Sequence, residues 1–136
     1  MNVYIMLKTK SYGVILVVAL SAILGTGIVL AQTTMTIEIG ITPATLNLYD
    51  VVDKCVTVHA DIDYTEVDLG HLELNGIPAI GTKEDNCGNL VVKFNRADVA
   101  RLVWPNDDTL ELTLTGETNE MVPTAFTGTD TISVKQ

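Results

Sequence analysis

The residues best suited to chemistry in this sequence are two histidines and two cysteines. His59 and His71 each lie two residues from an acidic side chain, Asp61 and Glu73 respectively. A zinc site needs three or four converging nitrogen, sulfur or oxygen ligands. The sequence shows no such ligand spacing around either histidine, and in a sandwich the strands that carry them tend to lie in different sheets. We therefore interpret both histidines as solvent-facing residues on strands.

No sequence pattern typical of an enzyme is present. The chain contains no G-x-S-x-G, no P-loop and no H-E-x-x-H, which are the patterns expected for a nucleophilic serine, a nucleotide phosphate site and a zinc hydrolase. Carboxylates are numerous, but none comes with a pocket signal that would indicate a glycosidase pair. We predict a protein that is not an enzyme and has no cofactor.

The two cysteines, Cys55 and Cys87, predict a disulfide. An even count in an exported chain favours a bridge. This one would close a 33-residue loop, worth about 3–4 kcal/mol in the chain-entropy model. Val56 and Val58 share one strand face, so Cys55 points to the other, and the loop that carries Cys87 would have to fold over that outer face or the strand end. Two free thiols are the alternative.

The aromatic residues offer a second kind of chemistry. Trp104 and Tyr64 could stack on a ligand such as a sugar. We favour a structural role for Trp104: it precedes Pro105 and is expected to cover the core at the end of a helix.

Residues 1–31 differ from the rest of the chain. Lys8 and Lys10 precede an uncharged apolar run over residues 14–31. This layout predicts a secretory signal peptide cleaved between Ala31 and Gln32. An uncleaved membrane anchor is the first alternative, because 18 apolar residues approach the length of a bilayer span. A pilin-like filament subunit that retains this helix is the second. We therefore expect an extracellular or cell-surface location.

The exported part is strongly acidic. After residue 31 there are seventeen acidic and six basic residues, a net charge of −11. Such a surface is a poor partner for nucleic acids and for anionic lipid headgroups. We expect protein or cell-envelope partners, self-association included, and membrane contact only through the N-terminal helix if it is uncleaved.

Period-two alternation of apolar residues over short segments predicts strands with one buried face. The Asn75-Gly76 pair favours a type I′ hairpin, and Asn95 can cap a short helix that ends before Pro105. We predict a loop over 81–89 and a helix over 95–103. The predicted strands cover residues 34–41, 45–50, 54–62, 71–74, 77–80, 89–94, 109–115 and 124–134.

These elements together predict an all-β fold. Over residues 32–136 we expect an immunoglobulin-like antiparallel β-sandwich of seven or eight strands with one short helix. It would lie behind an N-terminal hydrophobic helix in residues 1–31.

Four segments carry a resemblance to a known family. They are TLNL (45–48), LNGIPA (74–79), VKFNR (92–96) and a closing pattern that consists of LTLTG (112–116) and FTGTDTISV (126–134). With them, residues 35–136 resemble an uncharacterised immunoglobulin-like β-sandwich module that recurs in prokaryotic exported and cell-surface proteins. The resemblance implies a non-enzymatic structural or adhesion module at the cell envelope.

The same resemblance raises the question of calcium. Some relatives carry an Asp- and Gly-rich loop that is similar to a calcium loop, and this chain has Glu84, Asp85 and Asn86 at that place. Three such residues are few against the six to eight oxygen ligands that Ca²⁺ takes. A calcium- or carbohydrate-binding module is therefore an alternative function. Another is a filament in which the N-terminal strand is donated to a neighbouring copy.

Overall fold

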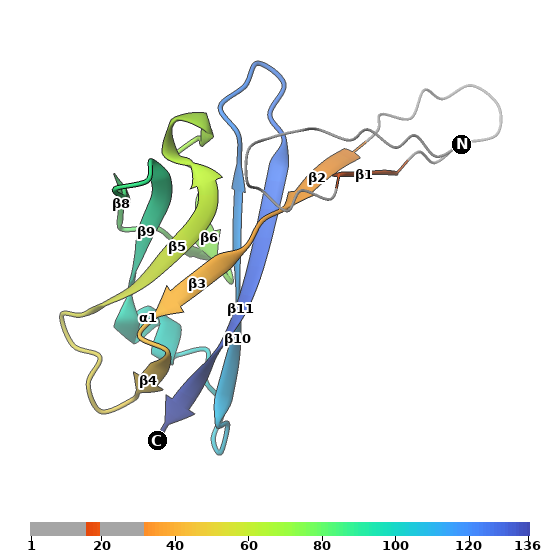
Figure 1. Ribbon diagram of the computed structural model, residues 1–136. Coiled ribbons are helices and arrows are strands. Elements are labelled where there is room, and N and C mark those ends of the chain that lie inside the picture. The colour runs from red at the N-terminus through yellow and green to blue at the C-terminus, as the bar shows by residue number, and fades with distance from the viewer. Residues whose placement is uncertain (1–15, 20–31) are drawn as a thin grey trace.

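The computed structural model describes residues 16–19 and 32–136, whose regular structure is mostly β (Figure 1). The described elements are β1 (Leu16–Ala19), β2 (Gln32–Thr36), β3 (Ile39–Thr42), β4 (Thr45–Asn47), β5 (Cys55–Asp63), the 3₁₀ turn η1 (Tyr64–Glu66), β6 (Glu73–Leu74), β7 (Ile77–Pro78), β8 (Gly81–Glu84), β9 (Asn89–Asn95), α1 (Arg96–Ala100), β10 (Thr109–Glu117) and β11 (Ala125–Lys135).

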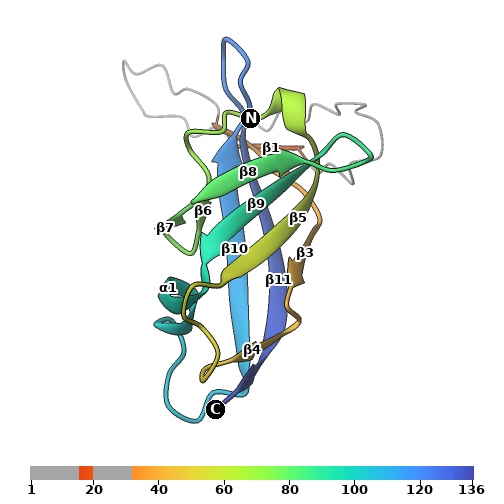
Figure 2. The ribbon, with the colours of Figure 1, turned by 90° about the vertical axis from the view of Figure 1, so that its left-hand side faces the viewer.

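The described strands form two sheets that face one another, consistent with a β-sandwich (Figures 1 and 2). The first has the order β1-β2-β11-β10-β6-β7, with β4 also paired to β11, and the second has the order β3-β5-β9-β8. The second sheet is antiparallel throughout. The first is mixed, because β2 and β4 both run parallel to β11. The prediction of an entirely antiparallel sandwich is therefore wrong for the pairing of β2 and β4 with β11.

The N-terminal segment crosses from one sheet to the other. The alternation over residues 34–41 predicts one strand, but the structure divides it into β2 and β3. The amide of Ile37 donates to Thr127 O in the first sheet at 2.9 Å, and the carbonyl of Glu38 accepts from Asp61 N in the second at 2.9 Å. The periodicity persists through the crossing, so the sequence pattern alone does not reveal it.

The core lies between the sheets and follows the predicted alternation. In β10, Leu110, Leu112 and Leu114 are buried between exposed or half-exposed residues. Phe94 of β9 and Phe126 of β11 are the largest fully buried side chains among the described residues. Full burial of an apolar side chain of this size contributes about 1.5–3 kcal/mol. The core therefore supports both sheets.

The predicted turn and helix start are confirmed. Asn75 and Gly76 have φ of 48° and 83°, as a type I′ turn requires. Asn95 caps α1 by accepting from Ala97 N at 2.9 Å. The helix ends at Ala100, earlier than predicted, because the next amides bond three residues back, Leu102 N to Val99 O among them. This tighter turn, rather than Pro105, closes the helix.

Residues 81–84, predicted as loop, form strand β8, which pairs with β9 at the edge of the second sheet. Lys83 and Glu84 are exposed. Charged edge strands of this kind protect a sheet from pairing with other chains, and they lack the apolar alternation by which strands are recognised. The prediction therefore missed this strand.

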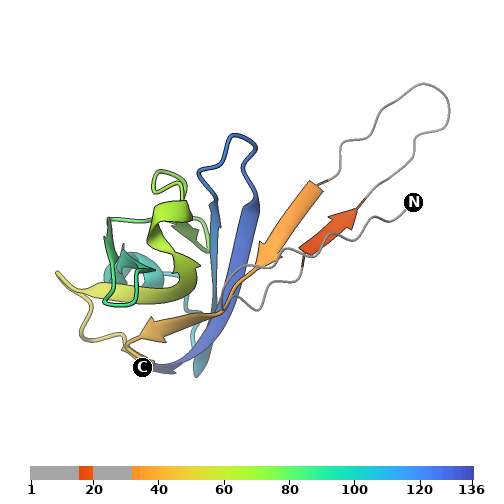
Figure 3. The same cartoon turned by 45° about the horizontal axis from the view of Figure 1, so that its top comes forward.

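Most of the predicted N-terminal helix, with Ala31, lies outside the described residues. Leu16–Ala19 form β1, which pairs antiparallel with β2, and Gln32 is the first residue of β2. Figure 3 shows β1 and the start of β2 extending beyond the other strands of the first sheet. Within the described ranges, no helix is long and apolar enough to cross a membrane.

Candidate functional site

Three side chains with metal-ligating or proton-binding groups meet at one end of the sandwich. They are Asp68 and His71, from the turn between η1 and β6, and Glu117, the last residue of β10. One ligand atom from each lies within 4.8 Å of the other two. We call this group the Asp68–His71–Glu117 cluster.

Backbone contacts hold the turn against the end of β10. Val67 forms an isolated antiparallel bridge with Thr118, and the amide of Asp68 donates to Glu117 O at 2.9 Å. Val67 and Thr118 are both buried. The backbones that carry the two carboxylates are therefore fixed side by side.

The turn is built around the carboxylate of Asp68. Its Oδ1 accepts from Gly70 N at 3.0 Å, and its Oδ2 lies 2.7 Å from His71 Nδ1. An aspartate that accepts from a backbone amide two residues on is a typical turn former. The local sequence Asp-Leu-Gly-His thus places the imidazole beside the carboxylate.

The cluster is electrostatically polarised, although it is exposed to solvent. The hydrogen bond from the Gly70 amide, followed by that from His71, lowers the pKa of Asp68. The hydrogen bond and charge of Asp68 raise the pKa of His71, and Glu117 and Glu73 add to the effect through their charges. The imidazole therefore lies in a field that favours a positive charge.

A shallow groove of about 440 Å³ adjoins the cluster. His71 and Glu117 contribute to its lining, and so do the apolar side chains of Leu72, Pro78 and Phe126. The lining of the groove therefore combines charged side chains of the cluster with apolar side chains.

Both histidines are exposed, as the sequence predicted, but His71 lies in the turn before β6 and not on a strand. His59 lies in a second shallow depression with Glu38, Asp61 and Asp85 on the second sheet. The acidic residue nearest to His71 in the sequence is Glu73, whereas its hydrogen-bonded partner in the structure is Asp68. The Asp-x-x-His spacing was a visible signal for that pair. Glu117 is distant in sequence and gave none.

The predicted Cys55–Cys87 disulfide is absent, and both cysteines are free. Cys55 is the first residue of β5. Cys87 lies near the other end of this strand, because the carbonyl of its neighbour Gly88 accepts a hydrogen bond from the amide of Tyr64, the residue that follows β5. Eight residues of strand at about 3.3 Å each put roughly 26 Å between these ends. A disulfide needs Cα atoms within about 7 Å, so the prediction is wrong on geometric grounds.

The three residues considered for calcium lie in the β8–β9 hairpin. Asp85 Oδ1 accepts from Cys87 N at 2.8 Å and from Asn89 N at 2.9 Å. Its carboxylate thus stabilises its own turn. Glu84 and Asn86 are exposed, and calcium binding here stays a prediction.

The aromatic residues are placed differently from expectation. Trp104 is 76% exposed, so the prediction that it covers the core is wrong. Its amide donates to Asp107 Oδ2 at 3.1 Å within the polar loop between α1 and β10, so this residue belongs to an exposed turn. Tyr64 is half-buried against the core. Tyr49 is 84% exposed.

Comparison of the chain with protein-family models, with curated proteins and with solved structures gave no match. The resemblance drawn from the four sequence segments therefore stays a prediction.

Proposed function

We propose that this chain is a non-enzymatic structural or adhesion module of the cell surface or extracellular space, with an immunoglobulin-like sandwich. The observation that carries the proposal is a group of large apolar side chains exposed at one end of the fold. Tyr49, Val52 and Trp104 are 84%, 77% and 76% exposed. Large apolar side chains that are exposed on neighbouring loops are candidates for an interaction surface. We call these three residues the apolar end.

Two loops present the apolar end beside the last residues of β11. The loop after β4 is tied to this strand by Leu48 N, which donates to Lys135 O at 3.0 Å. The loop after α1 is tied by Gln136 Nε2, which lies 3.3 Å from Trp104 O. Figure 2 shows both loops at the same end of the molecule as the C-terminus. The apolar groups therefore belong to one end of the sandwich.

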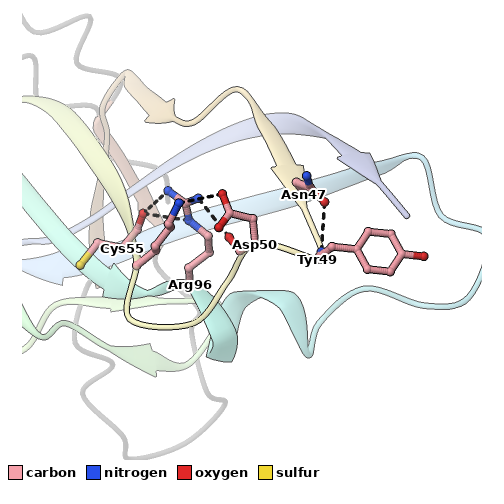
Figure 4. A network of polar contacts seen from close by, with 6 residues as sticks. Asn47, Tyr49, Asp50, Cys55 and Arg96 are labelled. Atoms are coloured by element: carbon pink, nitrogen blue, oxygen red, sulfur yellow. Dashed lines mark hydrogen bonds and ion pairs between the residues drawn. The ribbon is translucent and has the colours of Figure 1, made fainter.

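The loop that carries Tyr49 is ordered by a polar network (Figure 4). Arg96 donates through Nε and Nη2 to Cys55 O at 3.2 and 2.9 Å, and through Nη1 to Asp50 O at 3.3 Å. The Tyr49 amide donates to Asn47 Oδ1 at 3.0 Å, and its ring points away from the network. A loop that is fixed before it binds loses less entropy on binding.

The chemistry of the apolar end favours a protein or cell-envelope partner that covers aromatic surface. Tyrosine and tryptophan are enriched at the centres of protein interfaces, where a few such residues contribute most of the binding energy. A net charge of −11 on residues 32–136 keeps such a module soluble and disfavours nucleic acid. These features support adhesion.

The test compares binding before and after the apolar end is made polar. We expect Tyr49→Ser with Trp104→Ser to abolish binding of the purified protein to envelopes of its producing cells, or to abolish its self-association in sedimentation. Met121→Ser is the matched control, because Met121 is fully exposed in the β10–β11 turn at the other end of the molecule. Binding that survives the double substitution would overturn the proposal.

A filament subunit is the second candidate, and the pairing of β1 with β2 favours it. Leu16–Ala19 cover one edge of β2, and cleavage after Ala31 would remove that cover. An open strand edge can accept a strand from another copy. We expect residues 32–136 alone to polymerise if this candidate holds, and a monomer at high concentration in sedimentation would exclude it.

A further inference from the structure

We propose that Asp68, His71 and Glu117 form a binding site for a divalent transition-metal ion of the Zn²⁺ type. The inference rests on one imidazole and two carboxylates whose ligand atoms all lie within 4.8 Å of one another. It is independent of the adhesion surface, because Asp68 and Glu117 lie at the opposite end of β10 from the loop that carries Trp104.

The ligand set selects the class of ion. Imidazole nitrogen suits zinc, copper, nickel and iron, whereas magnesium and calcium prefer oxygen ligands alone. Three protein ligands with an open fourth position are the usual arrangement of a zinc site that keeps a bound water. The His71 side chain is 66% exposed, so water can complete the coordination.

The site is held in place before an ion arrives. The Val67–Thr118 bridge and the bond from Asp68 N to Glu117 O fix the two backbone segments. The bond from Gly70 N to Asp68 Oδ1 orients the first carboxylate while leaving Oδ2 directed at His71. A ligand oriented by such a neighbouring hydrogen bond loses less freedom when the metal binds.

The ion would take the place of the proton between His71 Nδ1 and Asp68 Oδ2. These atoms are 2.7 Å apart. Two tetrahedral zinc ligands at about 2.0–2.1 Å from the metal lie roughly 3.3 Å from each other. The pair must therefore open by roughly 0.6 Å, a shift within the reach of exposed side chains. The displaced proton passes to solvent, and the two carboxylates balance the charge of the ion.

The experiment is a calorimetric titration of the purified chain with Zn²⁺ alone, in a Cys55→Ser, Cys87→Ser background so that thiols do not bind the metal. We expect one ion per chain. His71→Ala should weaken binding by about tenfold or more, as should Glu117→Gln. His59→Ala is the matched control, because it removes the second exposed histidine of the described residues and leaves the cluster intact.

A second readout keeps the result independent of folding. In the NMR spectrum Zn²⁺ should shift the His71 ring resonances at concentrations that leave those of His59 unchanged. Equal affinity of the His71→Ala variant, equal shifts of both histidines, or no heat of binding at millimolar Zn²⁺ would each overturn the proposal. A circular dichroism spectrum identical to that of the parent chain shows that each variant is folded.

Discussion

Gly116 and Phe126 lie directly opposite each other in the β10–β11 ladder, and the ring of Phe126 occupies the space that a side chain at position 116 would need. A methyl group there would lie 2.4 Å from Phe126 Cζ and 2.8 Å from Leu72 Cδ2. The absence of a side chain at Gly116 therefore leaves room for the fully buried ring of Phe126.

The first prediction follows from this contact. Gly116→Ala should destabilise the fold by about 1–3 kcal/mol, because overpacking forces the ring or the strand to move. Urea unfolding should show a lower midpoint with an unchanged slope. Gly40→Ala is the control, because a methyl group there meets nothing within 4 Å. Equal midpoints for the two variants would contradict the packing argument.

The second prediction concerns the pair of His71 and Asp68. An NMR titration should give His71 a pKa above the ordinary value of 6.5, and Asp68→Asn should bring it back towards that value. The sign of the linkage follows from both groups: the pair stabilises the fold fully between pH 3.8 and pH 6.5, the ordinary pKa values of Asp68 and His71. This contribution is lost as the pH rises through the raised pKa of His71, and also as the pH falls through the lowered pKa of Asp68. A His71 pKa unaffected by Asp68→Asn would show that the hydrogen bond does not persist in solution.

The third prediction is that both thiols are free. The mass of the non-reduced protein should equal that of the reduced protein, and two thiols should react per unfolded chain. In the native state Cys87, which is exposed, should react faster than the half-buried Cys55. A mass 2 Da below the reduced value (two hydrogens lost in one disulfide) would mean that the strands rearrange.

The fourth prediction addresses the calcium alternative. Because Asp85 already bonds to the amides of Cys87 and Asn89, calcium or a chelator should leave the melting temperature unchanged. Asp85→Ala should lower stability by about 1–2 kcal/mol by removing these bonds, with or without calcium. A melting temperature that rises with calcium concentration would instead show binding to the folded state.

The sequence was sufficient wherever alternation and turn chemistry acted locally. The buried leucines of β10, the Asn75-Gly76 turn and the Asn95 cap all lie where the pattern predicted. Each depends on residues within a few positions of one another, so neighbouring side chains determine it.

The sequence was insufficient where partners are distant along the chain. The passage from β2 to β3 keeps the apolar period while the hydrogen-bond partners change from Thr127 to Asp61. Glu117 meets His71 only because the Val67–Thr118 bridge joins their segments. The sequence contains two cysteines, an even count that favours a disulfide, but the length of β5 separates Cys55 from Cys87 in the fold.

The last prediction tests how the apolar end is supported. Arg96 stands at the start of α1, and its planar guanidinium bonds to the carbonyl of Asp50, in the loop that precedes β5, and to that of Cys55, the first residue of β5. Lysine keeps the charge but cannot donate from three fixed nitrogens. Arg96→Lys should therefore lower stability by about 1–3 kcal/mol and increase amide exchange in residues 48–54.

The matched variant is Arg101→Lys, because Arg101 lies at the other end of the same helix, 80% exposed, with a single contact of 3.4 Å to Asp98. Exposed pairs of this kind contribute about 0–1 kcal/mol, so this change should be close to neutral. If Arg96→Lys weakens envelope binding while Tyr49 and Trp104 are intact, the loop must be fixed for the apolar end to bind. If stability falls and binding does not, the two aromatic residues act without that support.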